Sequence, residues 1–495
     1  MCPSASRNVP GSPAANSPGG LERTVTRRVC RVHLGCVGGT RRLAERPGAA
    51  GSKVARRAQW QRLIVGALLC LVPLRAALAR AGAVDGGRLM LPLSAAIATA
   101  LRVSPQVGEA QDLRTAGRYG ARAGRAALLP RLSVVAGRYW TQSRDGQPLY
   151  VSANGPQETF GLLQLSLPLY SPQLRALARL ARDRAALARS EQAQARLGVA
   201  AQVADGWYQL ALLRARVRIW KSTLRSVDIL YRGTQQKYAV GAAAVLDLEQ
   251  TKLLRHTAES GLQQARAERR AAQRVLDVLL GRVPSAPIVL PALRPASRPL
   301  PAEPLWIEKA RRAQPLLRIA ARQIAVGNSQ AGTLRATRLP TVTAGVDYGV
   351  DTVPTPRAGD LGWEVFLGLR MPIFNFGAQR DRIADAEARV AALRAARRSV
   401  LLQIRMTIAH DYGSARATER AYRQALKQRR EARSVYDMTR DGYKAGTLNA
   451  LDLAQAENGW LQARLRVAST LVLLRMARTQ LWLDAGTYPG VRSAT

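Results

Sequence analysis

The chain has 495 residues and a formal net charge of +42 at pH 7, with 5% aromatic and 22% charged residues. So few aromatics among many Ala, Leu and Arg argue against a compact β-rich domain and favour long helices. Residues 1–80 carry a net +12, and the remaining +30 is interleaved with Asp and Glu, as is typical of solvated helix faces. Because no zinc-finger spacing or aromatic-interleaved basic patch accompanies this charge, we predict no nucleic-acid partner.

The N-terminal part predicts an export signal. Residues 1–52 form a low-complexity basic leader, which is either disordered or the product of a start site assigned too early. Within residues 53–80, basic residues precede an apolar run at 63–74, and the small residues "AALA" follow it. This is the order of a secretory signal peptide, and the run is too short to span a membrane. All four cysteines precede residue 71, so a mature chain that begins near residue 80 contains none.

An internal repeat organises the rest of the chain. Residues 207–281 align without a gap onto residues 412–486 at a constant shift of 205, and the Leu-Pro at 129–130 recurs at 339–340. One structural unit is therefore present twice. The predicted divisions are a first repeat at 90–281, a linker at 282–303, a second repeat at 304–486 and a C-terminal tail at 487–495.

Each repeat predicts the same elements in the same order: a helix, two strands that form a hairpin, a long helix, a turn and a returning helix. The expected ranges are 106–128 and 316–337 for the first helices, 131–140 and 341–350 for the first strands, 160–170 and 363–374 for the second strands, 172–237 and 377–442 for the long helices, and 246–280 and 450–484 for the returning helices. Aromatic residues near the strand ends suit the interfacial girdles of a membrane sheet. They are Tyr139, Trp140, Tyr170, Trp363 and Phe374.

The long and returning helices predict antiparallel coiled coils. From Leu210 to Tyr231, apolar residues recur at alternating steps of three and four, which is the spacing of a coiled-coil seam. Gly281 and Gly486 are expected to end the returning helices, since glycine commonly follows a helix C-terminus.

The turns between these helices are nearly identical: "YAVGAAAVLDLEQT" at 238–251 and "YKAGTLNALDLAQA" at 443–456. Gly241 and Gly446 are expected to supply the left-handed residue that ends each long helix. Asn449 is a candidate N-cap for the second returning helix. The recurrence of Asp247 and Asp452 between leucines has two open explanations, a favourable carboxylate at a helix start or a functional site.

The strands constrain the assembly. Four strands per chain cannot close a transmembrane barrel, which needs about eight, and an open sheet edge cannot remain in lipid. We therefore predict a mostly helical α+β membrane protein whose sheet closes between subunits.

This ordered duplication resembles the TolC-type outer-membrane efflux proteins of Gram-negative bacteria, also called outer membrane factors, over roughly residues 90–486. The resemblance implies a homotrimer with one twelve-stranded barrel in outer-membrane lipid, continued by a periplasmic α-helical tunnel. It implies a channel-tunnel of a tripartite efflux or type I secretion system. Its partners would be a periplasmic membrane-fusion adaptor and an inner-membrane pump, either proton-driven or of the ABC type.

The resemblance also assigns roles at the two turns, which would form the periplasmic entrance. Asp452 matches the family's constriction ring, while Asp247 and Tyr443 match positions that hold neighbouring hairpins closed. The tip turns and adaptor contacts would involve Gly241, Gly446, Leu246 and Leu451. Two positions depart from the family pattern: Gln455 replaces a second carboxylate, and Leu448 stands where a basic residue is usual.

Other function classes have less support. His256 and His410 are isolated, and no catalytic, cofactor or metal-ligand spacing appears, so we predict neither an enzyme nor a cofactor. The alternative is a cytoplasmic coiled-coil scaffold that binds nucleic acid through its charge, which predicts neither an export signal nor strand pairs. Drug efflux, metal efflux and protein secretion all remain open as the transport task.

Overall fold

The computed structural model describes residues 90–145, 147–149, 157–283, 288–295, 298–352 and 361–488. The predicted leader and signal peptide lie outside them, as does most of the tail. These described residues belong to one compact unit. Its elements are α2 (Leu93–Val103), α3 (Pro105–Ala126), β1 (Arg131–Trp140), β2 (Ser143–Arg144), β3 (Gln147–Pro148), β4 (Gln157–Tyr170), α4 (Pro172–Ala239), α5 (Val245–Leu279), α6 (Glu303–Ala313), α7 (Pro315–Ala336), β5 (Thr341–Thr352), β6 (Gly362–Arg370), α8 (Ala378–Ala445) and α9 (Ala450–Asp484).

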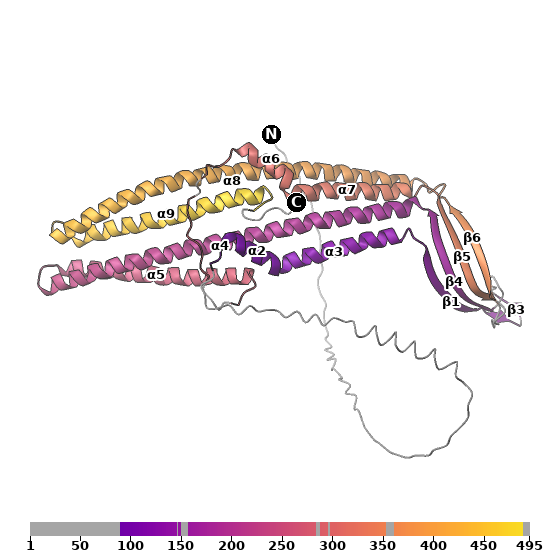
Figure 1. Cartoon of the computed structure of the whole chain (residues 1–495), viewed down its shortest axis with the longest axis horizontal. Coiled ribbons are helices and arrows are strands. Elements are labelled where there is room, and N and C mark those ends of the chain that lie inside the picture. The colour runs from indigo at the N-terminus through magenta and orange to yellow at the C-terminus, as the bar shows by residue number, and fades with distance from the viewer. Residues whose placement is uncertain are drawn as a thin grey trace, which may run out of the picture. The chain divides into compact units, whose positions relative to one another are not determined.

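The helix lengths repeat in pairs. α2 and α6 have 11 residues each, α3 and α7 have 22, α4 and α8 have 68, and α5 and α9 have 35. α5 runs back along α4, and α9 runs back along α8, so that each repeat ends in a helical hairpin (Figure 1). The predicted helices are all present, with ends that differ by at most three residues.

Local sequence explains where the long helices begin and end. Pro172 occupies the first turn of α4, and the Ser171 hydroxyl accepts a hydrogen bond from the Leu174 amide. Leu210 and Val227 of the predicted seam are almost fully buried. Gly281 and Gly486 follow the returning helices with φ of +61° and +78°, as expected.

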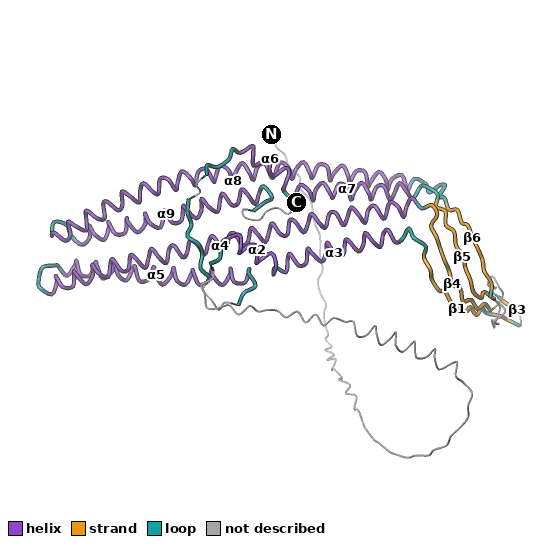
Figure 2. The backbone as a smooth tube through the Cα atoms, in the orientation of Figure 1, coloured by secondary structure: helices purple, strands orange, loops and turns teal. Residues whose placement is uncertain are grey.

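The four long strands form one antiparallel sheet in the order β1-β4-β5-β6, beyond one end of the helices (Figure 2). β1 pairs with β4 and β5 with β6, which confirms the two predicted hairpins. β6 ends at Arg370, so the predicted extension to residue 374 is wrong. Pro372 lies in that extension, and a proline has no amide to donate to a strand partner.

The pairing register gives the sheet two different faces. Residues paired across strands share a face, and successive residues alternate between faces. The apolar face includes Leu132, Val134, Leu163, Leu165, Val346, Trp363, Val365, Leu367 and Leu369. The polar face includes Arg131, Ser133, Glu158, Gln164, Ser166, Thr343, Asp347, Asp351, Glu364 and Arg370, with several glycines.

This alternation corrects the predicted aromatic girdle. Trp140 and Trp363 lie on the apolar face, where they are 70% and 74% exposed. Tyr139 precedes Trp140 and therefore lies on the polar face, against the Phe160 ring. Phe374 lies outside any strand.

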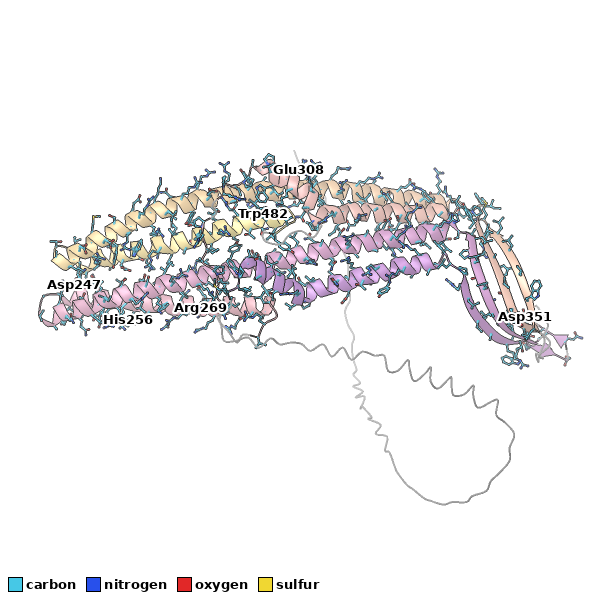
Figure 3. The ribbon with its side chains drawn as sticks, viewed as in Figure 1. Asp247, His256, Arg269, Glu308, Asp351 and Trp482 are labelled. Atoms are coloured by element: carbon cyan, nitrogen blue, oxygen red, sulfur yellow. The ribbon has the colours of Figure 1, made fainter. Side chains whose placement is uncertain are left out.

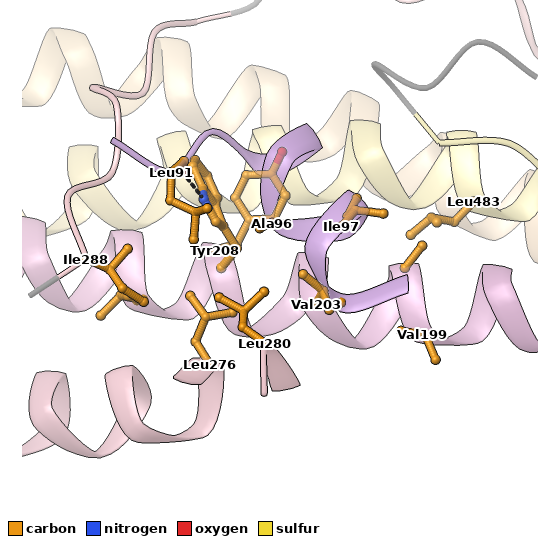
Figure 4. Close-up of a cluster of buried hydrophobic side chains, with 14 of the residues drawn as sticks. Leu91, Ala96, Ile97, Val199, Val203, Tyr208, Leu276, Leu280, Ile288 and Leu483 are labelled. Carbon is orange, nitrogen blue, oxygen red and sulfur yellow. Dashed lines mark hydrogen bonds between the residues drawn. The ribbon is translucent and has the colours of Figure 1, made fainter. Parts of the chain in front are cut away.

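The main apolar core lies at mid-length of the helices, where α2 covers α4 and the C-terminal end of α5 (Figure 4). The Trp207 indole donates to the Leu91 carbonyl oxygen over 2.9 Å. Tyr208 of α4 and Thr479 of α9 join their hydroxyls over 2.8 Å, which ties the two repeats together. Within the described ranges, no helix is long and apolar enough to cross a membrane.

Candidate functional site: the paired hairpin tips

The two hairpin turns lie side by side at the end of the helices that is far from the sheet. In Figure 3 the label Asp247 marks this end, and the label Asp351 marks the sheet at the other end. Gly241 and Gly446 have φ of +72° and +80°, the left-handed conformation that the sequence predicts. Both turns close in the same way. The Ala242 amide donates to the Lys237 carbonyl over 2.8 Å, and the Thr447 amide donates to the Gly442 carbonyl over 3.0 Å. These are the bonds of a helix-ending Schellman motif.

Both aspartates accept hydrogen bonds at a helix start. Asn449 caps α9 as predicted, because its side-chain oxygen accepts from the Asp452 amide over 2.9 Å. Asp452 Oδ2 accepts in return from the Asn449 amide over 3.3 Å. At the first tip, Asp247 Oδ2 accepts from the Ala244 amide over the same 3.3 Å. The first turn of a helix leaves amides unpaired, so a carboxylate there has a local role in both repeats.

Asp247 has a second bond that its counterpart lacks. Its Oδ1 accepts from the amide of Ala450, the first residue of α9, over 3.4 Å. Ala450 is fully buried, so this bond provides a partner for an amide that water does not reach. Asp247 thereby joins the two hairpin tips.

Tyr443 forms a second link between the hairpins. Its hydroxyl lies 2.8 Å from Oγ1 of Thr234, a fully buried residue of α4. Thr234 donates its own proton to the Leu230 carbonyl over 3.1 Å, so Tyr443 is the donor in the link. The ammonium of Lys237 lies 4.9 Å from the centre of the Tyr443 ring and adds a cation–π contact.

Thr234 and Gly442 were missed by the sequence reasoning. Thr234 continues the seam spacing, three residues beyond Tyr231, and a hydroxyl at an apolar seam position was the available signal. Gly442 makes room for Leu448, which stands where the family usually has a basic residue. A β-carbon on Gly442 would lie only 2.8 Å from Leu448 Cδ1. The leucine side chain therefore packs over this glycine instead of offering a charge. Leu246 and Leu451, the predicted contact residues, are 66% and 46% exposed.

A buried polar cluster lies further along the hairpins. Glu457 of α9 is 3% exposed, and burial raises the pKa of its carboxyl above the usual value. It shares a hydrogen bond with Tyr436 of α8, and burial together with this carboxylate raises the pKa of Tyr436 to about 12. Arg464 reaches Ser222 and Thr223 of α4 from the same cluster. The cluster gives the two hairpins a further polar connection.

Polar contacts of the tips and of the buried cluster join one hairpin to the other. Among the residues that the structure describes, no group of three or more His, Cys, Asp or Glu could hold a metal ion. His410 is 82% exposed and contacts Asp411, its neighbour in sequence.

The model of a family described as outer membrane efflux proteins matches residues 96–282 and 306–483, which take in nearly all of both repeats. The chain belongs to the outer membrane efflux protein family. CyaE of Bordetella pertussis is 26% identical over 379 residues, which cover 73% of this chain and 77% of CyaE. The crystal structure of CusC has the same fold at 18% identity, with a TM-score of 0.71 over 81% of this chain and 94% of CusC. VceC of Vibrio cholerae gives a TM-score of 0.69 at 20% identity, over 80% of this chain and 96% of VceC.

Membership of this family confirms the resemblance drawn from the repeated turns. It places the chain among outer-membrane transport proteins rather than enzymes. The alternative of a cytoplasmic scaffold is wrong, since it predicts no strand pairs and no such relatives.

Proposed function

We propose that the chain is one of three identical subunits of an outer-membrane channel-tunnel. The channel would receive substrates from a periplasmic membrane-fusion adaptor and an inner-membrane pump, and would release them outside the cell. Membership of the outer membrane efflux protein family supports this class of function.

The two-faced sheet is the observation that carries the proposal. Leu132, Val365 and Leu367 of its apolar face are 63%, 61% and 72% exposed in the single chain. Exposed apolar side chains on one face and charged ones on the other suit a wall with lipid on one side and water on the other. β1 and β6 are edge strands, whose unpaired amides and carbonyls lipid would not satisfy. Joining β6 of one subunit to β1 of the next would satisfy them.

The number of subunits follows from the strand count together with the family resemblance. A chain contributes four long strands, and closed membrane barrels begin at about eight. Three chains give twelve strands, the number that the resemblance implies. The helical hairpins would then extend as a tunnel, with the tips at its periplasmic entrance.

At that entrance the tips suit two tasks. Threefold repetition would place three copies of Asp452 around the axis, and a ring of carboxylates attracts cations. The exposed Leu246 and Leu451 would offer apolar contacts to the adaptor. Asp247 and Tyr443 would hold neighbouring hairpins together, as their bonds within the chain suggest.

Purification from the outer membrane tests the proposal. We expect the tagged protein in the outer-membrane fraction, and a native mass in detergent equal to three mature chains. N-terminal sequencing of that material should begin near residue 80. Recovery in the cytosol, or a stable monomer with a barrel-type β signal, would contradict the shared channel.

A further inference from the structure

Two aromatic rings lie against glycines on the polar face of the sheet. Phe160 of β4 is paired with Gly137 of β1, and Phe366 of β6 is paired with Gly345 of β5. A β-carbon on Gly137 would lie 2.8 Å from Cε1 of Phe160 and still closer to its Cζ, and one on Gly345 would overlap Cε1 and Cζ of Phe366. Real β-carbons do not approach other atoms this closely, so each ring occupies the space above its glycine. Both hairpins of the sheet contain this arrangement.

On the inner strands β4 and β5, the face that carries the rings is the more sheltered side of the sheet. Along β4, Gly161, Leu163 and Leu165 of the apolar face are exposed, whereas the residues between them are half-buried. Gly345 is buried. Tyr139 adds a third ring, with its centre 5.6 Å from that of Phe160 and a tilt of 32° between the planes. Aromatic side chains of this size would protrude into any passage along this face if they stood upright.

We propose that Gly137 and Gly345 set the width of the passage, because they let Phe160 and Phe366 lie flat against its wall. The proposal rests on the proposed function, in which the polar face lines a water-filled passage. A side chain at either glycine would lift the neighbouring ring off the wall. Threefold symmetry would repeat the obstruction three times at one level of the passage. The two glycine–phenylalanine pairs would then select cargo by size.

A purely structural role makes a different prediction. An aromatic ring over a strand glycine also covers exposed backbone and stabilises the sheet. In that case a substitution at Gly137 would change the stability of the sheet, while the passage of large molecules would remain the same. The width of the passage is therefore the quantity to measure.

The width of the passage can be measured from outside the cell, by the rate at which maleimides reach a single introduced cysteine. Thr343 lies on the polar face, closer to the helices than either ring, and the chain has no cysteine after residue 70. Intact cells that produce the Thr343→Cys chain would be treated with a small maleimide and with a maleimide on a polyethylene glycol chain. Val346→Cys, on the apolar face, provides the lipid-facing control. This design does not depend on whether the periplasmic end is open.

We expect Gly137→Ala to slow labelling of Thr343→Cys by the large maleimide roughly threefold and to leave the small one unaffected. Adding Phe160→Ala should restore the original rate, since no ring remains to be displaced. Gly362→Ala is the matched control: it adds the same methyl group to the same face, with no heavy atom within 4 Å. Labelling in that control should match the parent at both reagent sizes.

The outcomes separate this proposal from the one on which it rests. If Thr343→Cys in the outer membrane reacts with neither maleimide, the polar face lines no passage and the proposed function fails. If it reacts, but Gly137→Ala has no effect or Phe160→Ala does not restore the rate, only the proposal about width fails. If Gly137→Ala does not reach the outer membrane, the single variant Phe160→Ala tests the proposal instead. Removing the ring cannot narrow the passage, so slower labelling of Thr343→Cys by the large maleimide in Phe160→Ala would overturn the proposal.

Discussion

The two hairpin tips have almost the same sequence but differ in their contacts. Each has a left-handed glycine, the same turn bonds and an aspartate that accepts at the helix start. Only Asp247 of the first tip also accepts from the opposite hairpin. Of the two matching tyrosines, Tyr443 bonds to Thr234 of the other hairpin, and Tyr238 has no such bond among the described residues. The two repeats thus share the residues that end their helices, while the residues that join one hairpin to the other have diverged.

Elementary geometry accounts for this difference. Ending a helix needs only residues close in sequence, so both copies can keep the same solution. A contact between two unlike surfaces needs a donor on one side and an acceptor on the other. The two tips face each other with different residues and therefore contribute different partners. Substitutions at matching positions of the two tips separate the shared features from the specific ones.

The shared feature is the left-handed glycine. Gly241→Val and Gly446→Val should each lower the free energy of unfolding by about 1–2 kcal/mol, because a β-carbon is disfavoured at positive φ. Neither glycine has a heavy atom within 4 Å of its would-be β-carbon, so the cost is conformational and should be alike at the two sites. Denaturant titration of the purified protein would measure it.

Gly459→Ala is the control for these two variants. Gly459 lies inside α9, also with free space around it, and has no positive φ. Alanine there should stabilise the helix by about 0.5–1 kcal/mol. Clearly unequal costs at Gly241 and Gly446 would show that the tips differ even in how their helices end. If the proposed periplasmic adaptor docks at the tips, Gly446→Val should in addition weaken its binding.

The C-terminal ends of the returning helices α5 and α9 also differ at one matching position. Asp484 near the end of α9 corresponds to Leu279 of α5 in the repeat alignment. Burial and the neighbouring Asp411 carboxyl raise the pKa of Asp484 to about 8. The folded state therefore binds this proton more tightly than the unfolded state does. The stability that it contributes is fully present below the ordinary aspartate range and is lost as pH rises through about 8.

Asp484→Asn should remove this pH dependence. We expect the thermal midpoint of the parent to fall between pH 6 and pH 9 by about 2–4 °C more than that of the variant. Thermal unfolding at the two pH values checks the difference. Equal falls in the two proteins would mean that Asp484 is ionised at neutral pH in the folded chain.

The hydrogen bond from Tyr443 to Thr234 is a feature of the second tip alone among the matching tyrosines. Tyr443→Phe removes the donor and should lower the free energy of unfolding by about 1 kcal/mol. Loss of a link between hairpins should also raise the conductance of the channel in planar bilayers. Tyr238→Phe is the matched control, since Tyr238 holds the equivalent position in the first tip and is 42% exposed. Equal effects of the two changes would contradict the asymmetry described above.

Sequence reasoning predicted what depends on local pattern. Proline, glycine and the seam spacing located the long helices, and Asn449 marked a helix start that the structure confirms. It did not find Thr234, Gly442 or the buried Glu457, because their importance depends on which side chains lie opposite them in space. The two faces of the sheet likewise required the pairing register, and that register placed Tyr139 on the face away from Trp140. The function assigned to Asp452 remains a prediction.

The aspartates of the two tips, Asp247 and Asp452, differ in what their charge contacts. Asp452→Asn should cost only about 0.3–1 kcal/mol, since the change removes a charge near a helix start and keeps a hydrogen-bonding oxygen. If three copies of Asp452 surround the entrance, the variant should nevertheless lose cation preference, because the ring loses three charges at one constriction. Asp247→Asn should affect ion preference less and weaken the contact between hairpins, since its Oδ1 accepts from Ala450. Single-channel recordings in asymmetric salt would compare the two variants with the parent. Unchanged conductance and selectivity in Asp452→Asn would leave Asp452 as a helix-start residue alone, and the assignment of the entrance ring would fail while the fold stands.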